Sequence, residues 1–238
     1  MTGPSPDRPA ELHLLRHGES TGNVARAAAE SGGLDEIDIA ERDADVPLSD
    51  LGREQAASVG AWYAAQAPQD RPDVVIASPY LRALETARAV AGRLDVDLVV
   101  DERLRERELG VFDRLTHRGI TSRYPEEAER RQRLGKFYHR PPGGESWADV
   151  ALRLRSFWDT AGREHAGRRV LVVTHEVVVF LARYVLEGLT EQEVLRLNRE
   201  VELANCGLTR FALPPGEPAR LVAFDDREPV GTRTDVTE

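Results

Sequence analysis

Residues 14–23 read LLRHGESTGN, so the apolar end of a short run is followed at once by an arginine, a histidine and a glycine. The run ELHLL at residues 11–15 has the length and composition of a buried strand. Ligands in open parallel α/β sheets bind at the carboxyl ends of the strands. The stretch therefore predicts a buried strand that delivers Arg16 and His17 to a binding site.

Apolar runs of the same kind recur along the chain and alternate with segments of helical periodicity. This alternation predicts βαβ units and a mostly parallel sheet covered by helices on both faces. Two further runs near the C-terminus, CGLTRFAL (206–213) and ARLVAFDD (219–226), are expected to close one edge of the sheet. The other expected strands are DVVIA (73–77), VDLVV (96–100) and RVLVV (169–173), all buried, and the expected helices are LGREQAASVGAWYAAQ (51–66), PYLRALETARAVAGRL (79–94) and WADVALRLRSFWDTAGREH (147–165).

Two serines mark the expected starts of helices. Ser49 precedes the first helical segment, and Ser78 with Pro79 precedes the second. A serine N-cap followed by a proline in the first turn is typical of a helix start. We therefore expect the second helix to begin where the strand at 73–77 ends, with Ser78 as its cap.

The rest of the chain is less regular. Segments 24–47 and 110–145 lack a strand pattern and are expected to be insertions that wall the ligand pocket, the second made of short helices and loops over the site. We expect one domain over residues 1–238, with flexible ends at about 1–10 and 226–238.

The composition argues against several classes of protein. A net charge of −9 opposes a nucleic-acid partner, because binding to phosphates needs a basic face. Cys206 is the only cysteine, which rules out a disulfide within the chain and fits a reducing compartment. The N-terminal stretch MTGPSPDRPAE lacks the apolar region of a signal peptide, and the most apolar segment, 170–189, contains charged residues. A cytoplasmic protein without a membrane partner is expected.

Reactive or cationic side chains follow each of the expected parallel strands. A histidine or arginine in such a place is more often structural or solvated. An arginine at the positive end of a helix, however, needs an anion to offset its charge. The residues expected at this one edge are Arg16 and His17, Ser78 and Arg82, Glu106 and Arg107, and Thr174 and His175.

This set of side chains suits phosphoryl transfer from a phosphomonoester. Arginines offer planar, bidentate donors to phosphate oxygens, and helix N-termini add backbone amides. A neutral imidazole can attack phosphorus and form a covalent phosphohistidine. A carboxylic acid can protonate the leaving oxygen and then, as a carboxylate, activate water. Neither a metal nor another cofactor is required.

Motifs for other chemistry are incomplete or absent. HEVVV at residues 175–179 lacks the second histidine of a zinc metalloprotease helix. The chain contains no P-loop, no GxGxxG and no GxSxG. The remaining histidines have no metal-like spacing, and they are His13, His117, His139 and His165.

The ordered segments resemble those of the histidine phosphatase superfamily, the phosphoglycerate mutase-like proteins. RHGESTGN resembles the family signature, and the likeness extends over roughly residues 11–212. The segments that follow in order are PLSDLGREQA, SPYLRALETA, LRERELG and VVTHE. The resemblance implies a three-layer α/β/α sandwich on a mostly parallel sheet and a reaction without a metal.

The resemblance also implies a role for each matching residue. It assigns His17 as the phosphorylated nucleophile and Glu106 as the proton donor. Asn23 would contact the phosphate, and Ser20 is a weaker candidate for the same contact. The residues that would complete the phosphate pocket are Arg16, Arg82 and His175.

Departures from the family pattern favour hydrolysis over phosphoglycerate mutation. Leu109 stands where the mutases carry a tyrosine. Glu176 replaces the glycine usually seen after the second histidine, so the Glu176 carboxylate is a candidate substrate-binding group. Only the spaced cations Arg133, Lys136 and Arg140 stand where the mutases carry paired arginines. The segment RLGKFYHRPPGGESWADV looks more like the phosphatase branches, including broad-range acid phosphatases.

Three functions follow in order of expectation. The first is a metal-independent phosphomonoesterase for a small phosphorylated metabolite or a broad range of phosphoesters. A mutase that must hold a bisphosphate against water comes second, and a non-catalytic phospholigand-binding protein third. Nothing in the sequence names the substrate, and a homodimer is the default expectation for the assembly.

Overall fold

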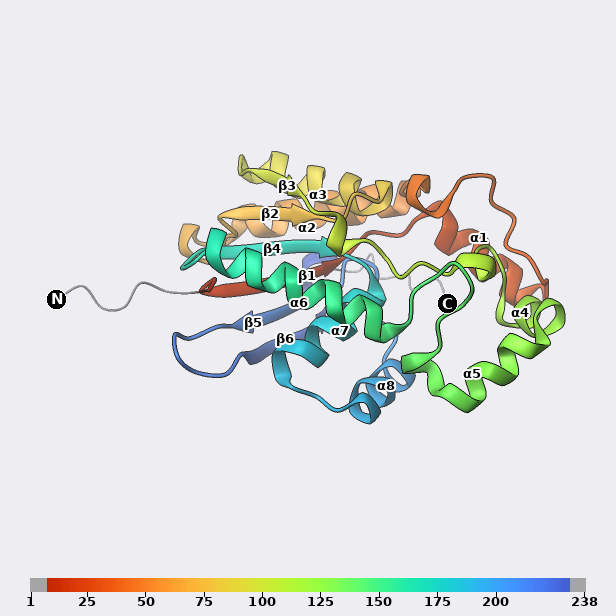
Figure 1. Ribbon diagram of the computed structural model, residues 1–238. Helices are drawn as coiled ribbons and strands as arrows, with labels where there is room; N and C mark the ends of the chain where they lie inside the picture. Colours follow the sequence, from red (N-terminus) through yellow and green to blue (C-terminus); the bar gives the residue numbers. More distant parts are fainter. Residues whose placement is uncertain (1–7, 232–238) are drawn as a thin grey trace.

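The computed structural model describes residues 8–231 and contains one six-stranded sheet in the order β3-β2-β4-β1-β5-β6 (Figure 1). β1 pairs in parallel with β4, β4 with β2, and β2 with β3, whereas β5 and β6 are antiparallel to their neighbours. The predicted mostly parallel sheet, closed at one edge by the two C-terminal strands, is therefore confirmed. The strands are β1 (Glu11–Arg16), β2 (Val74–Ala77), β3 (Leu98–Val100), β4 (Arg169–Thr174), β5 (Leu208–Ala212) and β6 (Arg220–Asp226).

Helices cover both faces of the sheet and give three layers. α2 (Asp50–Ala65) and α3 (Leu81–Leu94) lie on one face, and α6 (Trp147–Glu164) and α7 (Glu176–Glu187) lie on the other (Figure 1). α8 (Glu191–Glu200), which the sequence patterns did not predict, packs against α7. The predicted three-layer α/β/α sandwich is confirmed.

The alternation of side chains along β1 shows how each face is buried. Leu12 and Leu14 belong to the core beneath α6 and α7, whereas Leu15 belongs to the core beneath α2 and α3. Successive residues of a strand point to opposite faces, so buried leucines on both faces of β1 show that the strand is covered on both sides. β1 therefore lies in the centre of the molecule, and the residues after it emerge at a fixed place.

Two local predictions are wrong. The strand at 96–100 was expected to be buried, yet Val99 and Val100 are 42% and 50% exposed, because β3 lies at the sheet edge and pairs only with β2. Ser78 was expected to cap the second helix, but α3 begins at Leu81 with Tyr80 as its N-cap. Ser49 does cap α2, since its hydroxyl accepts a hydrogen bond from the Gly52 N–H at 3.0 Å.

The two predicted insertions lie together beyond the carboxyl ends of the strands (Figure 1). The first contains most of α1 (Thr21–Ser31) and the short 3-10 turn η1 (Asp43–Asp45), and the second contains α4 (His117–Arg123) and α5 (Pro125–Tyr138). A bridge between Glu36 and Leu115 joins them. The insertions thus form one wall at the edge where the site is expected.

The predicted flexible ends fall partly outside the described residues, which exclude 1–7 and 232–238. Within the described part, the Ala10 N–H donates to the Arg168 carbonyl at 2.9 Å, and Val230 is 3% exposed in the core beneath α2 and α3. Residues 8–10 and 226–231 therefore pack against the body of the protein. Among the helices of residues 8–231, none is both long and apolar enough to cross a membrane.

Candidate active site

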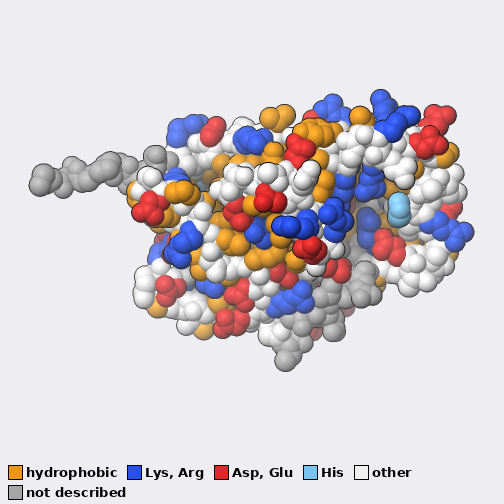
Figure 2. Space-filling view, turned by 90° about the horizontal axis from the view of Figure 1, so that it is seen from below, with side chains coloured by type: hydrophobic (Ala, Val, Ile, Leu, Met, Phe, Trp, Pro, Cys, Tyr) orange, Lys and Arg blue, Asp and Glu red, His pale blue; other side chains and the backbone are white. Residues whose placement is uncertain are grey.

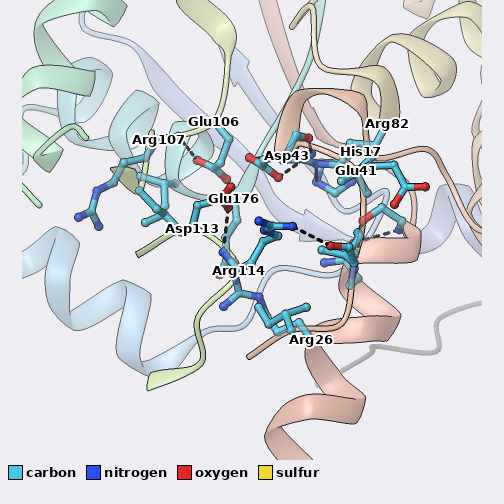
Figure 3. Close-up of a pocket in the computed structure, with 18 of the residues that line it drawn as sticks. His17, Arg26, Glu41, Asp43, Arg82, Glu106, Arg107, Asp113, Arg114 and Glu176 are labelled. Carbon is cyan, nitrogen blue, oxygen red and sulfur yellow. Dashed lines mark hydrogen bonds and ion pairs between the residues drawn. The ribbon is translucent and has the colours of Figure 1, made fainter. Parts of the chain in front are cut away.

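Two histidines meet where the central strands β1 and β4 end. His17 follows β1 directly and His175 follows β4 directly, and their ring centroids are 5.1 Å apart. Both side chains are buried. β2 ends beside them and leads into α3, which carries Arg82. The two histidines and Arg82 therefore meet at one edge of the sheet, as predicted, and Figure 3 shows His17 beside Arg82.

The close approach of two backbone segments fixes the position of His17. A Cβ atom on Gly18 would lie 2.6 Å from the carbonyl oxygen of Gly52, so only glycine lets the end of β1 pack against the first turn of α2. The Gly18 N–H donates to the Thr86 hydroxyl at 3.1 Å, and the His17 N–H donates to the Thr174 carbonyl at 2.9 Å. His17 therefore leaves the sheet in a rigid setting.

The imidazole of His17 is arranged as a neutral nucleophile. Its Nδ1 lies 2.7 Å from the carbonyl oxygen of Gly18, which can only accept, so Nδ1 carries the proton and Nε2 carries the lone pair. Burial lowers the pKa of His17 well below its usual value, and the charges of Arg82 and Arg16 lower it further. The ring thus stays uncharged, and its Nε2 keeps a lone pair that can attack an electrophile once the hydrogen bond from Arg82 Nε is released.

Arg16 supplies a buried donor that lacks a partner. Its Nη1 donates to the Leu203 carbonyl, which holds the guanidinium in place. Its Nε is buried and has no hydrogen-bond partner among residues 8–231. Leaving a buried donor unsatisfied costs about 1–3 kcal/mol or more for a charged group. The Arg16 Nε–H can therefore donate to an anionic acceptor that enters the site.

Arg82 is held by both the nucleophile and the first insertion. Its Nε donates to His17 Nε2 at 3.2 Å. Its Nη1 lies 2.5 Å from the Asp43 carbonyl and 3.0 Å from Asp43 Oδ1, and its Nη2 lies 3.3 Å from Asp43 Oδ2. The guanidinium also stands over the ring of Tyr80, 5.1 Å from its centroid. Asp43 therefore occupies donors that a phosphate would use.

His175 is buried between Ser78 and Tyr80. Its Nε2 lies 2.8 Å from the Ser78 hydroxyl, and its ring meets that of Tyr80 edge-on with centroids 5.2 Å apart. Burial, followed by the charge of Arg82, lowers the pKa of His175 well below its usual value. Its Nδ1 is a second buried nitrogen with no partner in the described part of the chain. His175 is also the N-cap of α7, whose positive end faces the same place.

Glu106 has the properties of a general acid. It lies on the loop after the short turn η3 (Glu102–Leu104), which follows β3, and Oε1 accepts from the Arg107 N–H at 2.8 Å. Burial is the main cause that raises its pKa, and the carboxylates of Asp43 and Glu176 raise it further. In Figure 3 the side chains of Glu106 and Glu176 lie close to each other. A raised pKa favours the protonated carboxyl group over the carboxylate.

Ser20 and Asn23 both line the cavity, but they first bind each other. The Ser20 hydroxyl accepts from the Asn23 N–H at 3.1 Å, and Asn23 Oδ1 accepts from the Ser20 N–H at 3.0 Å, which makes a capping box at the start of α1. Asn23 Oδ1 is thereby used. The Asn23 amide N–H groups have no hydrogen-bond partner within 8–231 and are left to donate to a ligand.

His17, Arg82 and Glu106 are among the residues that line a cavity of about 350 Å³, whose outer wall comes largely from the two insertions. Within the described residues, the lining does not include His175. The cavity's cations beyond the phosphate pocket are Arg26, Arg107 and Arg114, and its carboxylates include Glu41, Asp113 and Glu202. In the space-filling view, Lys and Arg side chains gather along a hollow, at the right of the view and away from the N-terminus (Figure 2). The lining as a whole carries five arginines and seven carboxylates, so positive charge is confined to the arginine side chains and does not make the whole cavity basic.

Sequence reasoning missed one residue at this site and misjudged the contact made by another. Asp43 lies in the unpatterned insertion, and no local signal in the sequence points to its contact with Arg82. Ser78 was interpreted as a helix cap, whereas its hydroxyl contacts His175. Cys206 is buried as expected, and burial raises the pKa of its thiol to about 12.

Comparison with known proteins agrees with this geometry. Residues 12–226 match the model of the histidine phosphatase superfamily, branch 1. A curated relative from Yersinia enterocolitica, probable phosphoglycerate mutase GpmB, is 30% identical over 202 residues, which cover 84% of this chain and 83% of the relative. The resemblance inferred from the sequence is thereby confirmed.

Solved structures are similar over nearly the whole chain. A mycobacterial glucosyl-3-phosphoglycerate phosphatase superposes with a TM-score of 0.69 at 26% identity and covers 91% of this chain and 98% of that one. A putative alpha-ribazole-5'-P phosphatase from Escherichia coli has a TM-score of 0.75 at 21% identity, covers 92% and 98%, and shows the shared fold alone. The chain belongs to branch 1 of the histidine phosphatase superfamily.

Proposed function

We propose that the protein is a metal-independent phosphomonoesterase that works through a phosphohistidine on His17. One observation carries the proposal: a neutral histidine, whose Nε2 lone pair accepts from the Arg82 Nε–H, lies beside two buried nitrogens, Arg16 Nε and His175 Nδ1, that lack partners within the described residues. A tetrahedral dianion would give both nitrogens an acceptor. The phosphorus atom would then face the nucleophile.

In the first step, His17 Nε2 attacks phosphorus and forms a P–N bond. The bond between phosphorus and the leaving oxygen breaks, and that oxygen takes the proton of Glu106. Arg16, Arg82 and His175 would donate to the phosphoryl oxygens, where negative charge is spread in the transition state. The raised pKa of Glu106 keeps this proton on the carboxyl group to a higher pH than is usual for a glutamate.

In the second step, water replaces the histidine. The Glu106 carboxylate accepts a proton from the water, whose oxygen attacks phosphorus as the P–N bond breaks. Inorganic phosphate leaves, and Glu106 is protonated again. The same side chain serves as acid and then as base, so the cycle ends with the protein in its starting state.

Among the described residues, the cavity lacks the contacts that a mutase needs, which supports hydrolysis rather than transfer of the phosphoryl group. Leu109, which stands in place of the mutase tyrosine, lines the cavity. The spaced cations lie elsewhere: Arg140 pairs with Asp149 at 2.8 Å, and Lys136 donates to Asn198. Phosphoglycerate mutation remains a second candidate, because the Yersinia relative is named a probable phosphoglycerate mutase.

The cavity suits a small phosphorylated metabolite. A volume of about 350 Å³ lies at the low end of the range for small-molecule sites, roughly 300–1,000 Å³. Its wall carries both cations and carboxylates, which can bind hydroxyl groups of a leaving group. Glu176, in the first turn of α7, is placed to accept from such a hydroxyl and not from a phosphate of like charge. We also propose a cytoplasmic location, which fits a chain with a single cysteine.

The test is the release of phosphate from p-nitrophenyl phosphate in the presence of EDTA. We expect turnover by the wild type and loss of it in His17→Ala. His117→Ala is the matched control, because His117 is an exposed histidine outside the cavity lining, and it should keep full activity. Activity that requires an added metal ion, or that survives in His17→Ala, would refute the proposal.

A panel of phosphorylated metabolites distinguishes the two candidate functions. It should contain 3-phosphoglycerate and glucosyl-3-phosphoglycerate, the compound named for one of the similar structures. We expect phosphate release to exceed the interconversion of 2- and 3-phosphoglycerate. Interconversion much faster than phosphate release would favour the mutase.

A further inference from the structure

Ser78 stands at the end of β2 with a hydroxyl that helix capping does not use. The residue is fully buried, and its N–H donates to the Val173 carbonyl at 3.0 Å, which fixes its backbone to the sheet. α3 begins three residues later without a side-chain cap. The position of the hydroxyl is therefore set by the sheet and not by the helix.

The partners of this hydroxyl determine where its proton goes. Its oxygen accepts from the Tyr80 N–H at 3.2 Å and lies 2.8 Å from His175 Nε2. Among residues 8–231, His175 Nε2 is the acceptor that the structure offers to the Ser78 O–H. Donation to Nε2 satisfies the hydroxyl and places the imidazole proton on Nδ1.

We propose that Ser78 is a positioning residue that holds His175 in the tautomer with the proton on Nδ1, so that the ring donates to a phosphoryl oxygen. The inference rests on the proposed function, because it assumes a phosphoryl group beside His17. A phosphate dianion only accepts hydrogen bonds. In the opposite tautomer, the lone pair of Nδ1 would face an anionic oxygen and repel it.

The two histidines of the site would then have opposite tautomers for opposite tasks. A carbonyl oxygen holds the proton of His17 on Nδ1 and leaves its Nε2 lone pair for attack. The Ser78 hydroxyl, which donates to Nε2 of His175, leaves the ring proton on Nδ1, the nitrogen that lacks a partner in the described residues. An imidazole ring can thus serve as a nucleophile or as a hydrogen-bond donor. The choice depends on whether its other nitrogen faces an acceptor, as in His17, or a donor, as in His175.

The experiment compares wild type, Ser78→Ala and Ser78→Thr bound to vanadate. Nitrogen-15 NMR of the histidine rings distinguishes protonated from unprotonated nitrogens, and a His175→Gln variant identifies the signals of His175. We expect Nδ1–H in the wild type and in Ser78→Thr. Ser78→Ala should populate the Nε2–H form and lose about 10- to 100-fold in kcat with little change in KM.

Ser146→Ala is the matched control for the loss of a buried serine hydroxyl. Ser146 caps α6 by accepting from the Asp149 N–H at 3.1 Å and does not line the cavity. This variant should lower stability while kcat stays unchanged. A loss of kcat that is equal in Ser146→Ala and Ser78→Ala would overturn the proposal, since it would reflect stability alone.

The remaining outcomes are decisive as well. An Nε2–H signal for His175 in the vanadate-bound wild type would overturn the proposal even if Ser78→Ala fails to fold. An unchanged tautomer and kcat in Ser78→Ala would overturn it too. A wild type that neither binds vanadate nor releases phosphate would instead refute the proposed function.

Discussion

Replacing Asp43 by asparagine should tighten the binding of phosphate. In the ligand-free protein, the carbonyl and both carboxylate oxygens of Asp43 contact Nη1 and Nη2 of Arg82. The remaining guanidinium nitrogen, Nε, contacts His17. These contacts use four of the five guanidinium N–H groups, so a phosphate that binds Arg82 through two N–H groups must displace at least one of them, and the Asp43 carboxylate competes with it directly.

The size of the effect follows from exposure and charge. The Asp43 side chain is 43% exposed, and an ion pair of this kind contributes about 0.2–1 kcal/mol. The carboxylate also repels the incoming dianion, which adds a contribution that solvent at the cavity mouth screens. Together we expect about 1.4 kcal/mol, which corresponds to roughly tenfold tighter binding.

The assay measures inhibition constants for inorganic phosphate and vanadate as competitors of p-nitrophenyl phosphate. Asp45→Asn is the matched control, because Asp45 lies in the same turn and pairs with the exposed Arg42 at 2.8 Å. Its inhibition constants should equal those of the wild type. Unchanged or weaker phosphate binding in Asp43→Asn would refute the reasoning and would mean that Asp43 orients Arg82 for the ligand.

Further predictions concern the acid, the pH profile and the C-terminal turn. Glu106→Gln should lose about 10²–10⁴-fold in kcat on an alkyl phosphate and much less on p-nitrophenyl phosphate, whose leaving group needs no proton, as measured by phosphate release. Activity should fall as pH rises through the raised pKa of Glu106, because the carboxyl group loses its proton. At low pH, activity should fall only below the depressed pKa of His17, where the imidazole gains a proton. A kcat/KM profile whose acid limb lies at or above pH 6.5 would contradict the burial of His17. Val230→Ala should lower stability by about 2 kcal/mol in thermal unfolding, whereas Val222→Ala, at a position 51% exposed, should change it little; equal effects would contradict the packing of residues 226–231.

The main features of the site could be predicted from sequence because they lie at strand ends. The apolar runs before His17 and His175 mark β1 and β4, and the rule that ligands bind at carboxyl ends brings the two histidines together. Arg82 follows from the same rule, in the first turn of the helix after β2. These predictions needed only short-range patterns and the parallel topology.

The contacts that complete the site depend on segments far apart in the chain. Ser78 meets His175 across 97 residues, and Arg82 meets Asp43 across 39 residues, in an insertion without periodicity. The exposure of β3 depends on its place at the sheet edge, which an apolar run does not reveal. Val230 lies in a charged tail whose composition is typical of a frayed end. The burial of this valine nevertheless holds the turn at Glu228–Val230 against the body of the protein.

The central claim is that His17 carries the phosphoryl group during turnover. Rapid mixing with p-nitrophenyl phosphate labelled with phosphorus-32, followed by an alkaline quench, should trap a base-stable, acid-labile phosphoenzyme within the first turnover. Mass spectrometry should place the label on His17, and His17→Ala should trap none. A label on another residue, or full turnover by the wild type without any trapped phosphoenzyme, would contradict the account.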